Sequence, residues 1–259
     1  MSVPPAFAPL AHGLRDEVIE HYERNGEPLD TSAGLRTLDT NSVLAPERAR
    51  LLLRLLAQAG AGAIGGRRVL DLGAGFGALA LYFAHLGAEV VAVDPNAQRM
   101  QVSLALARRH GLTLSAAAAT AQSLPFPDGH FDFVLANNSL CYIVARPARR
   151  EAFAEIHRVL RPGGWLALRN PNRLHPRDQF TGLPLLPLLP PAMAQRVVGA
   201  IGRHRSDVRL TTPAGAIFEL RRAGFSQVRF RTETGRRAKA LVAGYHHVLA
   251  RRRHADGDP

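Results

Sequence analysis

The sequence predicts an α/β fold in which helices cover both faces of a mostly parallel, doubly wound sheet. At residues 69–77 an apolar strand-like run ends in three alternating glycines, after which a new apolar segment begins. A second apolar run, residues 89–94, ends in an acidic residue. Beyond it, short apolar runs continue to alternate with amphipathic segments of helical length. This alternation is typical of βαβ units, which build a doubly wound sheet.

The periodicity of apolar residues predicts the individual elements in order. Residues 1–13 are rich in proline and alanine, and we expect them to be poorly ordered. Helices are predicted at 14–24, 46–59, 76–86, 97–110, 147–160, 192–203 and 213–223. Strands are predicted at 69–72, 89–94, 112–118, 131–136, 165–169, 228–232 and 240–250.

The composition indicates one globular unit rather than two equal domains. The chain has 259 residues, of which 46% are hydrophobic, and this is enough to bury one substantial core. Its single cysteine, Cys141, excludes an internal disulfide. No apolar run approaches the roughly 20 residues that span a bilayer, and the N-terminus lacks the pattern of a secretory signal. We therefore expect a cytoplasmic protein without a membrane span.

The chain is strongly basic, with a formal net charge of +12. Such a charge ordinarily suggests nucleic acid or an anionic surface as a partner. However, Lys239 is the only lysine and the arginines are spread along the whole chain, which favours a compositional bias. The cluster at residues 251–253 is typical of a solvated tail. We therefore expect a small-molecule partner rather than nucleic acid.

The glycine-rich run has the features of a ligand site. Gly73, Gly75 and Gly77 permit a sharp turn and let the backbone approach a ligand at a helix N-terminus. At the end of the next strand, Asp94 can accept hydrogen bonds from both hydroxyls of a ribose. Asp71, two residues before the glycines, would repel a pyrophosphate but attract a cationic group. This spacing favours S-adenosylmethionine, which carries an ammonium and a sulfonium, over a dinucleotide.

With this motif the chain resembles the class I S-adenosylmethionine-dependent methyltransferases, whose first motif has the form D-x-G-x-G-x-G. The resemblance includes residues 123–134 and 160–166 and covers roughly residues 67–170, the expected cofactor-binding core. It implies a seven-stranded sheet whose last strand is antiparallel, an N-terminal helical lid at residues 1–66, and S-adenosylmethionine as the cofactor. The residues expected against the cofactor are Asp71, Gly73, Ala74, Gly75, Gly77, Asp94, Pro95, Met100, Ala121, Gln122, Asn137 and, from the lid, Tyr22.

One position departs from the family pattern. Where relatives commonly have an aspartate that accepts from the adenine amino group, this chain has Thr120. The threonine hydroxyl, the carbonyl of Gln122 or a water could take its place. We therefore expect weaker discrimination of the adenine base. Met100, which the resemblance places against adenine, and Tyr22 could equally be ordinary packing residues.

Polar residues follow the strand at 131–136, where the C-terminal ends of parallel strands face the ligand crevice. Asn137 is the first candidate for the methionine end of the cofactor. Tyr142 stands where relatives often have a histidine, and it could orient an acceptor hydroxyl. The absence of an Asn-Pro-Pro-Tyr motif here counts against a methyltransferase of flipped bases or amide nitrogens.

Residues 171–207 are the most distinctive segment, and we interpret them as a cap that binds the acceptor. Their prolines exclude a regular helix or central strand at the start of the segment, while their leucines demand burial. His175 and His204 are candidate general bases, and Asp178 could orient a histidine or hold a substrate hydroxyl. The remaining residues, 208–259, are predicted to complete the core with an edge hairpin and a basic tail.

The chemistry expected is methyl transfer to a hydroxyl of a secondary metabolite, glycan or lipid-like compound with apolar and hydroxylated parts. Displacement at an activated methyl group asks the protein mainly for positioning and exclusion of water. Two alternatives stay open: an RNA methyltransferase that uses the basic surface, and a non-catalytic regulator that binds the cofactor. The spacing of cysteine, histidine and carboxylate residues indicates no metal site. We expect a monomer or a homodimer.

Overall fold

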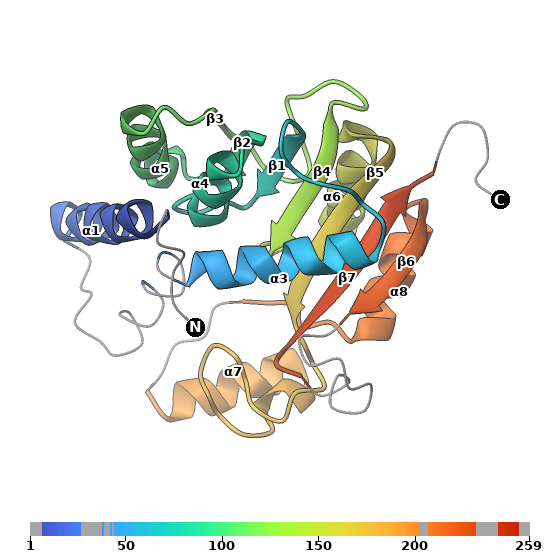
Figure 1. Ribbon diagram of the computed structural model, residues 1–259. Coiled ribbons are helices and arrows are strands. Elements are labelled where there is room, and N and C mark those ends of the chain that lie inside the picture. The colour runs from blue at the N-terminus through green and yellow to red at the C-terminus, as the bar shows by residue number, and fades with distance from the viewer. Residues whose placement is uncertain are drawn as a thin grey trace.

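The computed structural model describes residues 7–26, 38, 42, 44–202, 207–231 and 243–253. Seven strands form one sheet; they are β1 (Arg68–Leu72), β2 (Glu89–Asp94), β3 (Leu114–Ala118), β4 (Phe131–Asn137), β5 (Leu160–Pro171), β6 (Phe225–Arg231) and β7 (Tyr245–Arg252). Their order in the sheet is β3-β2-β1-β4-β5-β7-β6 (Figure 1). Neighbouring strands are parallel except at β7, which is antiparallel to both β5 and β6. The predicted fold class, with its last strand antiparallel, is confirmed.

Helices cover both faces of this sheet, and each group buries its own apolar cluster against the strands. The helices on one face are α1 (Ala8–Arg24), α3 (Ala45–Gln58), α4 (Ala78–His85) and α5 (Ala97–Arg109). The helices on the other face are α6 (Arg146–Val159) and α8 (Pro213–Arg222). The chain also contains η1 (Leu140–Tyr142) and, after β5, η2 (Leu186–Leu188) and α7 (Pro191–Ala200).

The central strand β1 shows why its sequence is continuously apolar. Val69 belongs to the cluster under α3 and α4, whereas Leu70 and Leu72 belong to the opposite cluster. Successive side chains of a strand point to opposite faces of the sheet. Because both faces of a central parallel strand are buried, the side chains on both faces are apolar. Asp71 is the polar exception, and it is only 3% exposed.

Helix α1 begins earlier than the sequence predicted. The expectation that residues 1–13 are poorly ordered is wrong for residues 7–13, because the helix starts at Ala8. The ring of Phe7 packs edge-on against Tyr82 with a centroid distance of 4.9 Å, and Leu10 is buried. This tertiary contact supplies burial that the local composition did not reveal.

The chain changes direction across the sheet at β1, which pairs with β2 on one side and β4 on the other. From β1 the connections run outward through β2 to β3, and the chain then returns to β4 and continues outward to β5. In open α/β sheets the ligand crevice lies beyond the carboxyl ends of the strands at such a switch point. The glycine-rich turn after β1 is therefore at the expected ligand site.

Candidate active site at the switch point

A cavity of about 940 Å³ opens at the carboxyl ends of β1, β2 and β4. This volume is within the range typical of small-molecule sites. Ten of the predicted cofactor residues line it: Tyr22, Asp71, Gly73, Ala74, Gly75, Asp94, Pro95, Ala121, Gln122 and Asn137. The structure therefore brings together residues from α1, from the turns after β1 and β2, and from the segments after β3 and β4.

The three glycines of the turn after β1 differ in what surrounds them. All have positive φ, from 56° to 73°. A Cβ at Gly73 would lie 2.2 Å from the Cβ of Ser139, and one at Gly77 would lie 2.3 Å from the Oγ of Ser103. At Gly75, by contrast, a Cβ would meet no atom within 4 Å. Gly73 and Gly77 are thus required by packing, whereas Gly75 leaves backbone open toward the cavity.

Asp94 links the end of β2 to the glycine turn. Its Oδ2 accepts from the amide of Gly75 at 2.9 Å, and its Oδ1 accepts from the amide of Asn96 at 2.9 Å. A carboxylate offers about four acceptor positions, so two are left for the hydroxyls of a ribose. The geometry fits the predicted role, because the backbone bonds hold the carboxylate at the cavity wall.

Asp71 is buried in the wall of the cavity, and burial raises its pKa to about 7. A hydrogen bond from the backbone of Ala80 in the first turn of α4 acts against this rise, while the nearby charge of Asp94 adds to it. A cation in the cavity would favour the charged carboxylate and lower the pKa again. The site is therefore suited to a positively charged ligand group.

Two polar oxygens of the wall have no hydrogen-bond partner among the described residues. They are the Oδ1 of Asn137 and the Oγ of Ser139, both at buried atom positions. Buried acceptors without a partner are costly, so a ligand donor at this place would stabilise them. The ammonium of S-adenosylmethionine is such a donor, and the first-choice role of Asn137 fits the structure.

The wall after β3 contains the predicted adenine position. Thr120 lines the cavity and forms a tight turn in which the amide of Ser123 donates to its carbonyl at 3.1 Å. Met100 does not line the cavity; it is 2% exposed and belongs to the cluster under α1 and α4. Its neighbour Arg99 reaches the wall instead, with its Cζ 5.7 Å from the ring centroid of Phe76.

Tyr22 lies at the cavity, on the helix that the sequence assigned to the lid. Its ring centroid is 5.7 Å from that of Phe76, which belongs to the glycine turn. The start of α3 adds Leu44, Glu47 and Arg48 to the same wall. Most of residues 27–43 lie outside the described part of the chain.

The cavity wall also contains two residues that sequence reasoning missed. Arg169, near the end of β5, and Tyr245, at the start of β7, both line the cavity. The Cζ of Arg169 lies 3.5 Å from the ring centroid of Tyr245. The position of Arg169 at a strand's carboxyl end was an available signal, whereas its pairing with Tyr245 depends on the β5–β7 register.

Tyr142 also lines the cavity and is 52% exposed. Partial burial, followed by the proximity of Cys141 and Tyr245, raises the pKa of its hydroxyl, and Arg99 acts in the opposite direction. The phenol therefore keeps its proton near neutral pH. It can orient an acceptor as a hydrogen-bond donor, and it is a poor base.

The structure does not bring His175 or Asp178 to the cavity. The Nδ1 of His175 lies 2.6 Å from the carbonyl oxygen of Arg177 and 2.9 Å from the Nε2 of Gln179. Asp178 is 2% exposed. Its Oδ1 accepts three hydrogen bonds, from the Thr181 amide at 2.8 Å, from the Phe180 amide and from the Thr181 hydroxyl. Both residues thus have a local role in the turns after β5.

His204 lies outside the described residues. Among the described residues, no group of three or more histidine, cysteine or carboxylate side chains could hold a metal ion. None of the described helices is long and apolar enough to cross a membrane.

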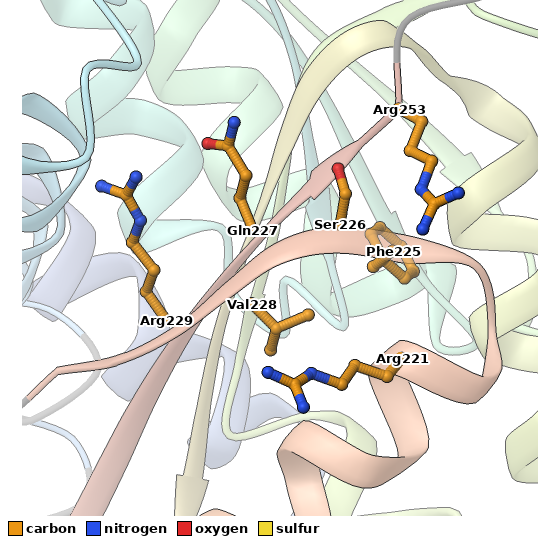
Figure 2. Close-up of a pocket in the computed structure, with 7 residues that line it drawn as sticks. All are labelled: Arg221, Phe225, Ser226, Gln227, Val228, Arg229 and Arg253. Carbon is orange, nitrogen blue, oxygen red and sulfur yellow. The ribbon is translucent and has the colours of Figure 1, made fainter. Parts of the chain in front are cut away.

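A second hollow lies at the sheet edge, around β6 (Figure 2). Its polar lining includes Arg221, Arg229 and Arg253, whose side chains point in different directions in Figure 2 and do not converge on one point. At Gln227 the backbone has a φ of 45° and the pairing with β7 shifts register. A bulge and charged side chains are the usual protection of an exposed sheet edge. We therefore assign this hollow to edge protection rather than to catalysis.

Sequence comparison places the core of the chain among known proteins. Residues 70–168 match the family model described as a methyltransferase domain. An uncharacterized protein of Mycobacterium tuberculosis is 41% identical over 114 residues, which are 44% of this chain and 40% of that protein. A ubiquinone/menaquinone biosynthesis C-methyltransferase of Shewanella oneidensis is 38% identical over 110 residues, or 40% of this chain and 43% of that enzyme. The chain thus spans about two fifths of the length of these curated relatives.

Solved structures share the fold at low sequence identity. One is the Burkholderia thailandensis 1,6-didemethyltoxoflavin-N1-methyltransferase with bound 1,6-didemethyltoxoflavin and S-adenosylhomocysteine (TM-score 0.54, 22% identity, 95% of this chain and 90% of that one). Another is an S-adenosylmethionine-dependent methyltransferase from Mesorhizobium loti (TM-score 0.55, 22% identity, 76% and 96%). The [4+2]-cyclase SpnF is also similar (TM-score 0.57, 21% identity, 80% and 81%). Likeness at this level establishes the fold, which by itself does not decide the chemistry.

Proposed function

We propose that the chain is an S-adenosylmethionine-dependent methyltransferase that methylates a small-molecule acceptor. The match of residues 70–168 to a methyltransferase-domain family supports this proposal. The observation that carries the proposal is the cavity at the switch point. It is lined by the carboxylates of Asp71 and Asp94, the unpartnered oxygen of Asn137 and the open backbone of Gly75. This donor and acceptor set suits a ligand with a cationic end and a ribose.

Each wall residue has a distinct task in this proposal. Asp71 offers a negative charge to the cationic methionine end, and Asn137 accepts from its ammonium. Asp94 accepts from the ribose hydroxyls, and Thr120 lies at the adenine end. When bound, the cofactor supplies a methyl group on a positively charged sulfur, which is the electrophile of the reaction. The protein contributes position and a wall that excludes water.

We infer that the acceptor has an acidic hydroxyl, such as a phenol or an enol. The described wall of the cavity contains no histidine. It does contain Arg48, Arg99 and Arg169, together with Glu47 and the two cofactor aspartates. Guanidinium groups stabilise anionic oxygens, so they favour an acceptor that loses its proton without a dedicated base. Because Arg169 stacks on the ring of Tyr245, its positive charge is held at one position in the cavity wall.

The negative charge is shared between the oxygen and the ortho and para ring carbons in a phenolate, and between the oxygen and the α-carbon in an enolate. We propose methylation at oxygen as the first candidate outcome. The relative from Shewanella oneidensis is named a C-methyltransferase, which supports methylation at carbon as the second. Nuclear magnetic resonance of the methylated product distinguishes the two, because the methyl shifts of a methoxy group and of a carbon-bound methyl group differ.

The first test is ligand-dependent thermal stability. We expect S-adenosylhomocysteine, but not NAD, to raise the thermal midpoint, since a ligand at a hundredfold its Kd adds about 2.7 kcal/mol. Asp94→Asn should reduce that gain, because it replaces one ribose acceptor with an amide nitrogen. Asp128→Asn is the matched control, since Asp128 is an exposed acid paired with Arg158 away from the cavity. A shift with NAD, or with neither ligand, would contradict the proposed cofactor.

The second test follows labelled methyl groups from S-adenosylmethionine into cell extracts. We expect label in the small-molecule fraction. Label that appears only in RNA, with binding that falls steeply as salt rises, would support the nucleic-acid alternative instead. Binding of the cofactor without any transfer would support a regulatory role.

A further inference from the structure

Large apolar side chains are exposed on the segment after β5. Five of them lie on η2, α7 and their caps, and we call these five the cap face; each is more than two fifths exposed: Leu185 (60%), Leu188 (50%), Met193 (51%), Val197 (43%) and Ile201 (50%). Single exposed apolar residues are normal on a protein surface, but a concentration of this kind marks an interaction site.

The cap face is one side of an amphipathic element whose other side is already packed. Met193, Val197 and Ile201 recur at every fourth position, so they lie along one flank of α7 and its C-terminal cap. Ala194 and Val198 on the adjacent flank are buried in a small cluster of their own. Figure 1 shows α7 beyond the carboxyl ends of β4 and β5, apart from the helices that cover the sheet. The packed flank holds the helix in place, and the second apolar flank faces solvent.

An acceptor pocket does not account for this exposure. No described residue of the cap at 171–207 lines the cavity at the switch point. The cap does come close to it, since the ring centroid of Phe180 is 6.3 Å from that of Tyr142. The cap face is therefore a separate surface next to the candidate site.

The sequence around the cap face is basic. Between residues 185 and 201 the sequence contains no acidic residue and one basic residue, Arg196. Arg173 and Arg177 precede this stretch in the sequence. Of the neighbouring acids, Asp178 is buried in its turn, and Asp207 accepts from the Nε2 of Gln195 at 2.7 Å. An apolar surface with basic flanks is complementary to a lipid interface that carries negative charge.

We propose that the cap face docks onto an anionic lipid membrane, with its apolar side chains in the interface and Arg196 near lipid phosphates. A second copy of the chain fits less well, because each copy has a net charge of +12 and association would bring like charges together. The inference does not depend on methyl transfer. Where both proposals hold, docking would place the cavity beside a source of lipid-like acceptors.

The test is cosedimentation of the full-length protein with vesicles. We expect binding to vesicles of equal parts phosphatidylcholine and phosphatidylglycerol, weak binding to phosphatidylcholine alone, and release as salt rises. The double substitution Met193→Ser and Val197→Ser should lower the partition coefficient about tenfold or more, since it removes apolar groups from the interface. Phe218→Ser is the matched control, because Phe218 is 64% exposed but lies on α8.

Two further measurements keep the result unambiguous. The Met193→Ser, Val197→Ser variant should keep the thermal midpoint of the wild type. If that variant does not fold, the double substitution Leu185→Ser and Leu188→Ser replaces it, and we expect the same loss of vesicle binding. Equal binding to both kinds of vesicle, unchanged binding of the variants, or a wild-type dimer that these substitutions dissociate would each overturn the proposal. None of these outcomes affects S-adenosylhomocysteine binding, so failure here is distinct from failure of the proposed function.

Discussion

Replacement of Asp71 by asparagine tests two effects of its carboxylate. The buried charge lowers the unfolding free energy of the free protein, and the same charge strengthens binding of the ligand. The side chain is 3% exposed, and its burial raises the pKa to about 7 from a reference value of 3.8. Asparagine has the same shape and keeps an oxygen that can accept from the Ala80 backbone. The substitution therefore removes the buried charge with little change in packing.

The size of the effect follows from the pKa difference. One pKa unit corresponds to about 1.4 kcal/mol, so the difference here corresponds to at most about 4 kcal/mol of unfolding free energy. Below pH 4 the carboxyl is protonated in the folded and unfolded states, and this cost is absent. As pH rises from about 4 to 7, the unfolded state ionises first, so the folded protein loses stability. Above pH 7 the loss is complete, and Asp71→Asn should then be more stable than the wild type.

Urea unfolding with and without S-adenosylhomocysteine, at several pH values, measures both halves of this prediction. Trp165 is the only tryptophan and is 5% exposed, so its fluorescence reports unfolding of the sheet. We expect Asp71→Asn to be the more stable protein at pH 8 without ligand and to gain less from the ligand. The wild type should gain more from the ligand at pH 8 than at pH 5, because the charged carboxylate attracts the ammonium.

Asp132 provides a control of opposite sign. Partial burial would raise the pKa of its carboxyl, but hydrogen bonds from the Arg68 amide and from Arg161, with the charge of Arg67, lower it overall. Its contribution to stability is therefore present at neutral pH and lost as the pH falls below the unfolded value near 4. Asp132→Asn should destabilise the neutral protein and leave ligand affinity unchanged. An Asp71→Asn protein that is less stable than the wild type at pH 8 would refute the reasoning about buried charge.

Three other outcomes follow from the site. Gly73→Ala should destabilise the fold by roughly 1–3 kcal/mol or more, because its Cβ would collide with Ser139. Gly75→Ala should destabilise the fold less but weaken S-adenosylhomocysteine binding. Calorimetry of unfolding and of ligand binding on both variants separates the two effects. His175→Gln should leave methyl transfer within about twofold, since the structure places this ring in a turn away from the cavity; a loss of about a hundredfold in turnover would restore it as the general base. With Thr120 in place of an aspartate, adenosine-based and inosine-based analogues should bind with similar affinity, and strong rejection of the inosine form in a titration would show that another group reads the amino group.

The sequence by itself determined the class of the fold and most of the residues that line the cavity at the switch point. The relevant signals are local: glycines with positive φ after β1, an acid at the end of β2, and polar residues after β4. Short-range sterics allow few residue types at such positions, and parallel strands bring their carboxyl ends to one edge of the sheet. The identity of these residues was therefore sufficient to predict where they meet.

Tertiary structure decided which of two adjacent side chains faces the cavity, and which residues distant in the sequence come into contact. Met100 and Arg99 are adjacent on α5, and only the packing of that helix shows that the methionine is in the core and the arginine at the cavity. Arg169 meets Tyr245 because of the antiparallel register of β5 and β7. The leucine-rich cap was expected to line the acceptor site, yet much of its apolar surface faces outward. Such outcomes depend on contacts between segments that are distant in the chain, and apolar character alone does not specify which neighbour buries a side chain.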